Sequence, residues 1–246
     1  RNRHIVPAPA GTIAGPVMLH GYLPAILGGL QSTLSVAAVS LLVACVFGLV
    51  GAAAKLSASP AANAAALVYT TLIRGVPELV LMLLIFYGGQ IAINALADRM
   101  GAGYIDINPF IAGTMTLGFI FGAFLTGTFR GAVLAIPRGQ TEAALAYGLT
   151  RGQVLRRITL PQMIRHAIPG FTNSWLVMLK ASALVSIIGL DDMVHRASLA
   201  AAATRQPFTF YATIALIYLA LTTISILALG WLERRYSLDV RKADFR

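Results

Sequence analysis

Charged residues are scarce in this chain of 246 residues: they make up 11% of it, whereas hydrophobic residues make up 57%. A soluble domain carries roughly 25% charged residues, so the composition argues against an ordinary soluble domain and indicates a chain that lies in a bilayer. Acidic residues are the rarer charged type, 9 against 19 basic ones. The basic excess does not indicate nucleic-acid binding, because it lies between apolar runs, where membrane topology places it, and forms no stripe with interleaved aromatics.

Residue sets that carry enzyme chemistry are also missing. The single cysteine, Cys45, lies in an apolar run, which excludes an intrachain disulfide and is typical of a small core residue. No nucleophile, base and orienting group can be matched, and no Gly-rich phosphate loop with its Lys-Ser/Thr is present. The histidines have no second ligand at metal spacing: His4, His20, His166 and His195. The chain is therefore predicted to be no enzyme and to bind no metal or cofactor itself.

What the chain does have is long apolar runs. Five of them have the ~20 residues that a helix needs to cross ~30 Å of hydrocarbon, whereas barrel strands would be ~10-residue alternating segments. The runs are 27–54, 78–96, 109–129, 168–190 and 208–232. A further helix is expected at 61–74, near the cytoplasmic interface, and Gly75 and Pro77 break it from the second run. The predicted fold class is an all-α membrane protein, a bundle of about five transmembrane helices.

The positions of Lys and Arg predict the orientation of the bundle. Most of them fall in stretches that would be cytoplasmic if the N-terminus lay outside and the C-terminus inside. This topology divides the chain into an outer N-terminal extension at 1–21, a transmembrane domain at 22–240 and a cytoplasmic tail at 241–246. No signal-peptide pattern precedes residue 28.

The longest polar loop, at about 131–165, has a fixed pattern on the predicted cytoplasmic side. Glu142-Ala143-Ala144 is followed after three residues by Gly148 and, after nine further residues, by Ile158-Thr159-Leu160-Pro161. We expect Thr141 to cap a helix with Glu142 in its first turn, since a carboxylate is stabilised at the positive end of the helix dipole.

Gly148 and Gly152 then permit a turn or a close backbone approach. A second, basic helix is expected at 153–157, which Pro161 helps to end. Such a helix–turn–helix can dock into a cleft of a soluble partner and pass a rigid-body motion to the spans. An ordinary amphipathic connector is the alternative, but it needs no fixed spacing.

This loop resembles the EAA loop of ABC importer permeases. Arg74-Gly75-Val76-Pro77 is similar to the Arg-Gly-x-Pro signature of polar amino acid permeases, and 179–184 and 232–236 match the same family. The resemblance covers about 22–240 and is closest to permeases of histidine, lysine, arginine, ornithine or opine importers. It implies the fold of a type I ABC importer permease in the bacterial inner membrane. Related chains often have Glu where this sequence has Gly127, so that role is missing here or supplied by a partner.

The resemblance also implies partners and contact residues. The partners are an ABC ATPase homodimer that holds ATP and Mg, a second and different permease, and a periplasmic substrate-binding protein. Contact with the ATPase is expected at the following positions: Glu142, Ala143, Ala144, Gly148, Arg151 and Pro161.

Polar residues inside the spans are candidates for the substrate pathway, because they are expensive in a bilayer. They are Glu78, Asn173, Lys180 and Ser182. Each residue has an alternative. Glu78 can be stabilised at a helix start and paired with Arg74, and Lys180 can form a structural pair with Glu78 or with the partner chain. Asn173, Ser182 and Ser186 can line one pathway, with the two serines joined as an i, i+4 stripe, or can be packing groups that bond across helices. Asp191 and Asp192 would cap the outer end of the fourth span as solvated loop charges or as a docking point.

Two other kinds of protein are alternatives to an ABC permease. A secondary transporter or channel that works without ATP would have paired intramembrane carboxylates or inverted repeats, and neither is present. A non-transporting membrane anchor would need no coupling loop. Within the family, glutamine, glutamate or another polar amino acid remains open as the cargo, and so does a homodimer.

Overall fold

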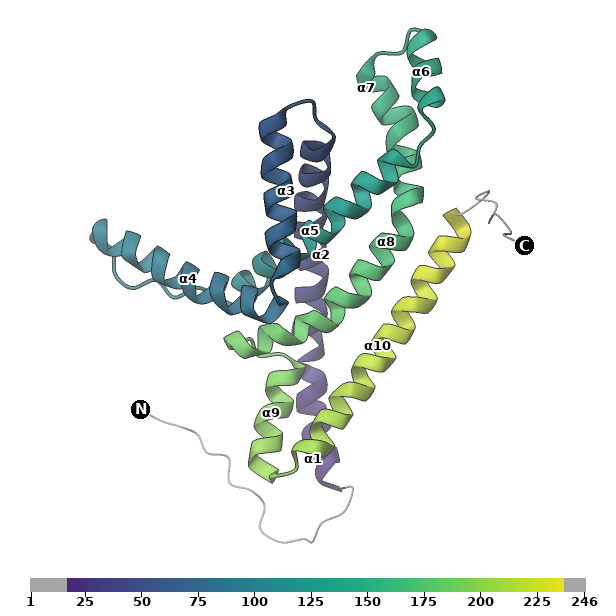
Figure 1. The fold of residues 1–246 in the computed structure, drawn as a ribbon. Helices are drawn as coiled ribbons and strands as arrows, with labels where there is room; N and C mark the ends of the chain where they lie inside the picture. Colours follow the sequence, from purple (N-terminus) through teal and green to yellow (C-terminus); the bar gives the residue numbers. More distant parts are fainter. Residues whose placement is uncertain (1–16, 237–246) are drawn as a thin grey trace.

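The computed structural model describes residues 17–236, and every regular element in that part of the chain is a helix (Figure 1). The tail at 241–246 and residues 1–16 of the predicted extension lie outside the described residues. The elements are α1 (Val17–Gly28), α2 (Leu30–Leu56), α3 (Pro60–Gly75), α4 (Glu78–Arg99), α5 (Pro109–Leu134), α6 (Arg138–Ala146), α7 (Arg151–Val154), the π-helix η1 (Leu155–Thr159), α8 (Leu160–Ala181), the 3₁₀-helix η2 (Ser182–Ile188), α9 (Met193–Thr204) and α10 (Pro207–Tyr236).

Five helical stretches are long and apolar enough to cross a membrane, which confirms the predicted bundle. They are Gly21–Leu56, Glu78–Arg99, Pro109–Leu134, Arg151–Ile188 and Pro207–Arg235. The first contains 36 residues and the fourth 38. At 1.5 Å per residue these stretches are roughly 54 and 57 Å long, more than a bilayer core needs. Their ends therefore extend beyond the hydrocarbon, and the fourth carries the polar loop at one end.

The core of the bundle lies between α2 and α5. Four glycines form what we call the α2–α5 seam: Gly48 and Gly51 on α2, and Gly118 and Gly122 on α5. At each of them an added Cβ would lie against a side chain of the other helix. Small residues let two helix backbones approach closely, which is how helices associate in lipid, where no hydrophobic force drives them together. As a result α5 is the most buried span, whereas α4 and α10 are mostly exposed.

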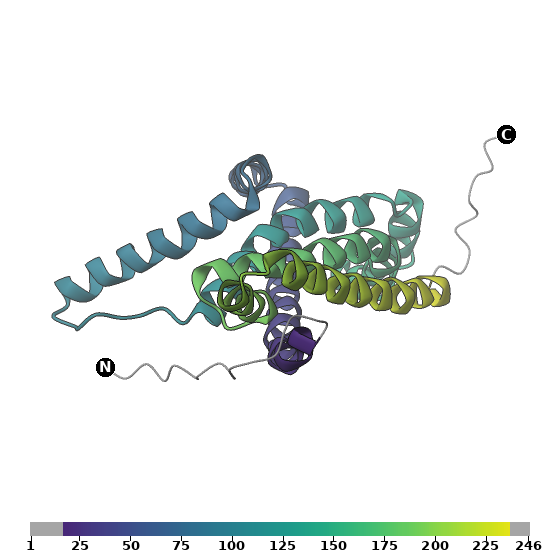
Figure 2. The same ribbon diagram turned by 90° about the horizontal axis from the view of Figure 1, so that it is seen from below.

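The other helices surround this seam. Figure 2 shows α5, α8 and α10 side by side, with α4 reaching out on the other side of the bundle. Helix α3 lies beside the C-terminal half of α2 and is tied to α5 by the Tyr69 hydroxyl, which donates to the carbonyl of Phe119. The predicted break is confirmed: α3 ends at Gly75, Val76 and Pro77 are extended, and α4 begins at Glu78.

Helix α4 holds the loop that follows it through two side-chain amides. Gln90 Oε1 accepts from Ile107 N at 3.0 Å, and Asn94 Oδ1 accepts from Ile105 N at 2.8 Å. The Asn94 amide also donates to the carbonyl of Ile105 at 3.0 Å. These bonds give partners to backbone N–H and C=O groups of the extended segment and hold it beside α4.

Candidate functional site: the helix–turn–helix between α5 and α8

The polar loop forms a helix–turn–helix that projects from one end of the bundle (Figure 1). Its first helix, α6, begins at Arg138. The residue before it, Pro137, has the non-helical backbone angles φ −57° and ψ 127°. The prediction that Thr141 caps this helix is wrong, because the Thr141 hydroxyl donates to the carbonyl of Arg138 at 2.8 Å inside the helix. Glu142 consequently lies in the second turn, where the helix dipole stabilises it less.

Gly148 makes the turn between the two helices. Its φ is +84°, which L side chains rarely adopt. The N–H of Leu149 donates to the carbonyl of Ala144 at 3.1 Å, and the N–H of Gly148 donates to that of Leu145 at 2.9 Å. This pair of bonds is the Schellman motif that ends a helix, so the predicted turn at Gly148 is confirmed. Gly152 has no atom within 4 Å of an added Cβ and makes no close approach in this chain.

The second helix begins with a capping box at Thr150. Thr150 Oγ1 accepts from Gln153 N at 3.4 Å, and Gln153 Oε1 accepts from Thr150 N at 2.8 Å. These reciprocal bonds satisfy two backbone donors that a helix start leaves without partners. The helix therefore starts at Arg151, two residues before the predicted position.

Pro161 does not end this helix, contrary to the prediction. The chain winds without a break from α7 through η1 into α8, and Pro161 lies in the first turn of α8. Proline has no N–H to offer the carbonyl four residues earlier, at Arg157. The preceding residues adopt a π-helix, in which Leu160 N donates to Leu155 O five residues back. Pro161 thus accounts for a change in helix type where the loop joins a span.

All but one of the residues predicted to contact the ATPase are exposed. Glu142, Ala143, Gly148, Arg151 and Pro161 are exposed, but Ala144 is buried at 7% exposure under the turn. Ala144 therefore supports the turn instead of offering a contact surface. The second helix also borders a groove of about 600 Å³, which is lined by Thr150, Gly152, Gln153, Arg156 and Arg157.

Sequence reasoning missed three large apolar side chains on this site. Tyr147 is 89% exposed, Leu155 53% and Leu145 46%. Apolar side chains that project from a polar loop are candidates for a protein contact. An aromatic residue directly before the glycine of the turn is the signal that could have found Tyr147.

Arg74 of the signature and the pathway candidate Glu78 form no ion pair with each other. Arg74 is exposed, and its Nη2 donates to the carbonyl of Phe124 at 3.2 Å. Its guanidinium carbon lies 5.0 Å from the centroid of the Phe124 ring, a cation–π contact. Within residues 17–236 the single ion pair joins Asp191 and Arg196, so the alternative of an Arg74–Glu78 pair is wrong, as is a Lys180–Glu78 pair.

The candidate pathway residues of the fourth span do not share one face. Asn173 and Lys180 are both exposed, two turns apart on α8. Ser182 is instead buried, and its hydroxyl donates to the carbonyl of Leu179 at 2.7 Å. Ser182 and Ser186 lie in the 3₁₀-helix η2, which has 3.0 residues per turn, so the expected i, i+4 stripe does not form.

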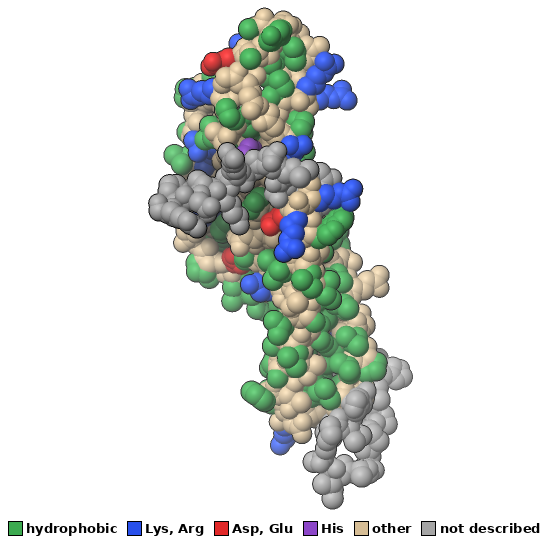
Figure 3. Space-filling model, turned by 90° about the vertical axis from the view of Figure 1, so that its right-hand side faces the viewer, with side chains coloured by type: hydrophobic (Ala, Val, Ile, Leu, Met, Phe, Trp, Pro, Cys, Tyr) green, Lys and Arg blue, Asp and Glu red, His purple; other side chains and the backbone are tan. Residues whose placement is uncertain are grey.

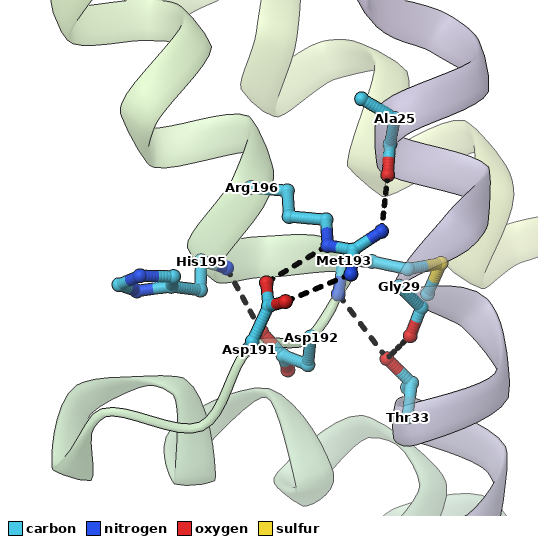
Figure 4. A network of polar contacts seen from close by, with 8 residues as sticks. All are labelled: Ala25, Gly29, Thr33, Asp191, Asp192, Met193, His195 and Arg196. Atoms are coloured by element: carbon cyan, nitrogen blue, oxygen red, sulfur yellow. Dashed lines mark hydrogen bonds and ion pairs between the residues drawn. The ribbon is translucent and has the colours of Figure 1, made fainter. Parts of the chain in front are cut away.

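A polar network anchors the opposite end of the bundle, between α9 and the start of α2 (Figure 4). Asp191 accepts two 2.8 Å bonds from Arg196, and Arg196 Nη1 donates to the carbonyl of Ala25 at 2.9 Å. The Arg196 guanidinium holds the pKa of the Asp191 carboxyl below its ordinary value. Asp192 caps α9 by accepting from His195 N at 2.8 Å.

Asp192 is not a solvated loop charge, contrary to one of the expectations for it. It is 0% exposed, and its Oδ2 is buried without a hydrogen-bond partner among the described residues. Burial raises the pKa of its carboxyl above the ordinary 3.8. Asp191, by contrast, is 64% exposed, in keeping with a loop charge.

The two aspartates should therefore respond to pH with opposite signs. A raised folded-state pKa means that the carboxyl of Asp192 favours the fold below its unfolded value, and this contribution is lost as pH rises through the folded value. We expect Asp192→Asn, which keeps the cap, to gain thermal stability over the parent chain as pH rises above about 4. Melting curves of the purified protein in detergent, from pH 4 to 8, measure this.

Asp191→Asn is the matched control. The lowered pKa of Asp191 gives a contribution that is present above its unfolded value and lost as pH falls, so this variant should lose stability near neutral pH. The loss should be about 0–1 kcal/mol, because the pair is exposed. A loss of stability by Asp192→Asn at every pH would contradict the assignment of Asp192 as an unpaired buried carboxyl.

Comparison with known proteins shows the family of this chain. Residues 44–238 match the model of the family described as the binding-protein-dependent transport system inner membrane component. The chain belongs to this family. The match includes the helix–turn–helix and four complete spans, so the projecting loop is part of the family architecture.

Two permease proteins with known names are similar to this chain. The chain is 53% identical over 227 residues to the histidine/lysine/arginine/ornithine transport system permease protein HisQ of Escherichia coli, with 92% of this chain and 100% of HisQ covered. It is 43% identical over 194 residues to the octopine transport system permease protein OccQ of Rhizobium radiobacter, with 78% and 82% covered. These identities extend over more than three quarters of this chain.

Solved structures share the fold. The crystal structure of an amino acid ABC transporter with histidines superposes with a TM-score of 0.77 at 31% identity, covering 91% of this chain and 100% of that one. The MetNI methionine ABC transporter in an inward-facing conformation superposes with a TM-score of 0.69 at 19% identity, which supports the fold alone. The chain therefore has the fold of a type I ABC importer permease.

Proposed function

We propose that this chain is the transmembrane permease subunit of an ATP-driven importer, and that its cargo is a basic amino acid or an opine. The observation that supports this best is the projecting helix–turn–helix in a chain 53% identical to HisQ over 92% of its length. HisQ carries the name of a histidine, lysine, arginine and ornithine transport permease, and OccQ that of an octopine permease.

The partners follow from the mechanism. A loaded binding protein docks on the outer face, and ATP closes a dimer of partner ATPase chains that holds the ATP and Mg. The exposed side chains of the helix–turn–helix receive that motion, and the continuous helix from α7 to α8 passes it to the fourth span. Within this chain the contact comprises Glu142, Ala143, Gly148 and Arg151, together with the exposed Tyr147.

The charge distribution supports an orientation with the helix–turn–helix in the cytoplasm. Figure 3 shows Lys and Arg side chains gathered over the end that carries α6 and α7, with mostly hydrophobic side chains on the lower part. Arginines of this end are Arg138, Arg151, Arg156, Arg157 and Arg165. Cytoplasmic loops carry such an excess, so five spans would place the N-terminus outside and the C-terminus inside.

The decisive experiment is purification of the chain from its own membranes in mild detergent, followed by identification of every subunit that comes with it. Two copies of an ATPase with one different permease would support the proposal in full. Two copies of this chain with the ATPase would support the importer and contradict the mixed pair. Recovery of the chain without any ATPase would contradict the proposal and favour a transporter that works without ATP.

A further inference from the structure

The helix that leads from the turn into the fourth span contains a segment that bends easily. Residues Leu155–Thr159 form the π-helix η1, and Pro161 follows in the first turn of α8. Sharp bends in helices occur at prolines and at π-helical turns, where the regular backbone hydrogen bonds are interrupted. No residue of η1 is buried, so packing against the bundle does not support it. A force applied at the turn would therefore bend the helix at 155–161 more easily than it would move α8.

One side-chain hydrogen bond bridges this segment. Gln162 Nε2 donates to Gln140 Oε1 at 2.5 Å. Gln162 directly follows Pro161 in the first turn of α8, and Gln140 lies in the first turn of α6. The bond therefore joins the two ends of the projecting helix–turn–helix across 22 positions of the chain. We call this bond the amide clasp.

The amide clasp completes a series of contacts along the helix–turn–helix. At the tip, the positive φ of Gly148 and the Schellman bonds fix the turn. In the middle, Ala144 of α6 and Val154 of α7 are both buried, at 7% and 6% exposure. At the base, the clasp is the one side-chain hydrogen bond between α6 and α8 in the part of the chain that the structure describes. Without it the element would be held at its tip and middle but not beside η1.

The clasp matters for its position and not for its strength. Gln140 is exposed and Gln162 is partly buried, so water competes for both amides and the bond adds little to the stability of the fold. Its effect is mechanical, because it connects the residue just beyond the segment that bends to the helix on the other side of the turn. Two separately solvated glutamines would have no such effect.

We propose that Gln140 and Gln162 are positioning residues for coupling, and that their amide bond holds α6 and the start of α8 together as one rigid body across η1. This inference rests on the proposed importer function. A motion of the partner ATPase that reaches α6 then moves α8 directly, and bending at η1 does not absorb it. In this role the pair needs no contact with ATP or with the cargo.

Leucine substitutions in the complete importer complex test this inference. Gln140→Leu and Gln162→Leu remove the amide, so each should lower the cargo imported per ATP hydrolysed by about threefold to tenfold. The double variant should lose no more than either single variant, because the same bond is lost in all three. Gly139→Ala is the matched control: it changes the preceding residue of α6, has no atom within 4 Å of the new Cβ, and should leave the ratio unchanged.

A conservative substitution separates the bond from other effects of this surface. Gln140→Glu offers a carboxylate to Gln162 Nε2 and should keep the parent ratio. Combined with Gln162→Glu it faces a second carboxylate, and the ratio should fall as in the leucine variants. Hydrogen exchange of residues 155–162, measured on the same preparations, should be faster in every variant that loses the bond. It should be unchanged with Gln140→Glu and with Gly139→Ala.

Three outcomes would overturn the inference. One is an unchanged ratio with both leucine variants. Another is an equal loss with Gln140→Glu and Gln140→Leu without faster exchange, because Gln140 would then contact the partner directly. The third is an additive loss in the double variant, which would give the two glutamines separate roles. In each case an ATPase that co-purifies with the parent chain leaves the proposed function standing, whereas a parent chain without any ATPase would contradict that function itself.

Discussion

A methyl group added at Gly122 is expected to lower the free energy of unfolding of the bundle by about 1–3 kcal/mol. The Cβ of Gly122→Ala would lie 2.5 Å from Phe47 Cβ, 2.9 Å from Tyr69 Oη and 3.5 Å from the carbonyl oxygen of Ala44. Phe47 Cβ is bonded to the backbone of α2 and cannot rotate away. Relief therefore requires α2 to move off α5.

Such a movement would affect the whole α2–α5 seam. One turn along, a Cβ at Gly48 would already lie 2.7 Å from Leu125 Cβ, and Gly51 lies against Thr126. The same displacement would disturb the bond from the Tyr69 hydroxyl to Phe119, which ties α3 to α5. Because interhelical packing replaces the hydrophobic force inside a membrane, the lost contacts are not regained elsewhere.

Unfolding of the detergent-purified chain by increasing SDS, followed by circular dichroism, measures the change. Gly131→Ala is the matched control: it lies on the same helix, has no atom within 4 Å of the new Cβ, and should be neutral or stabilising by up to about 1 kcal/mol. Equal stability of the two variants would show that α2 and α5 are not in contact at Gly122.

The sequence was sufficient for the features of this fold that depend on length and local composition. Five spans follow from apolar runs of about 20 residues, and the break at Gly75 and Pro77 follows from the conformational limits of proline. The turn at Gly148 was also predictable, because a glycine at fixed distance from a helix is the usual C-terminal signal. Each of these features is decided by a few neighbouring residues.

Features that depend on competition between signals were not predictable. Both Thr141 and Pro137 favour a helix start. The helix begins directly after the proline, which is four residues before Thr141. Pro161 suggested a helix end. A proline is tolerated in the first turn of α8, however, and the residues before it adopt a π-helix because Pro161 has no N–H to donate. Local propensity could not decide either case.

Burial of Asp192 depends on contacts that are far apart in the sequence. The backbone of Asp192 and Met193 lies against Gly29, where an added Cβ would be 2.5 Å from Met193 N. Met193 N also donates to Thr33 Oγ1 at 3.4 Å, across 160 positions of the chain. Neighbouring residues in the sequence do not indicate such a contact. Asp192, an aspartate in a loop, was therefore expected to be solvated.

Gly148→Val is expected to lower ATP-driven uptake by about tenfold or more while the melting curve of the membrane bundle stays unchanged. The φ of +84° costs a residue with a Cβ about 1–2 kcal/mol, and a β-branched side chain is particularly poor there. No atom lies within 4 Å of the new Cβ and Gly148 is exposed, so backbone strain is the expected cause of the effect.

The strain acts at the end of α6, a helix with little stability of its own. Helix α6 has nine residues, too few to be stable alone, and the Schellman bonds from Gly148 and Leu149 hold its end. Once these bonds are lost, Glu142 and Tyr147 no longer keep a fixed position relative to α7. A rigid-body motion of the ATPase would then deform the loop and would not reach the fourth span.

Uptake into liposomes that contain the complete complex tests this prediction, with ATPase recovery measured on the same preparation. Gly152→Ala is the control, because it adds a methyl group four residues later, in open space and without a positive φ. Gly148→Asn should fall between the two, since asparagine tolerates the left-handed region better than valine. Equal loss of uptake with Gly148→Val and Gly152→Ala would mean that the partner contacts this surface directly, whereas loss with Gly148→Val alone would assign the effect to the shape of the turn.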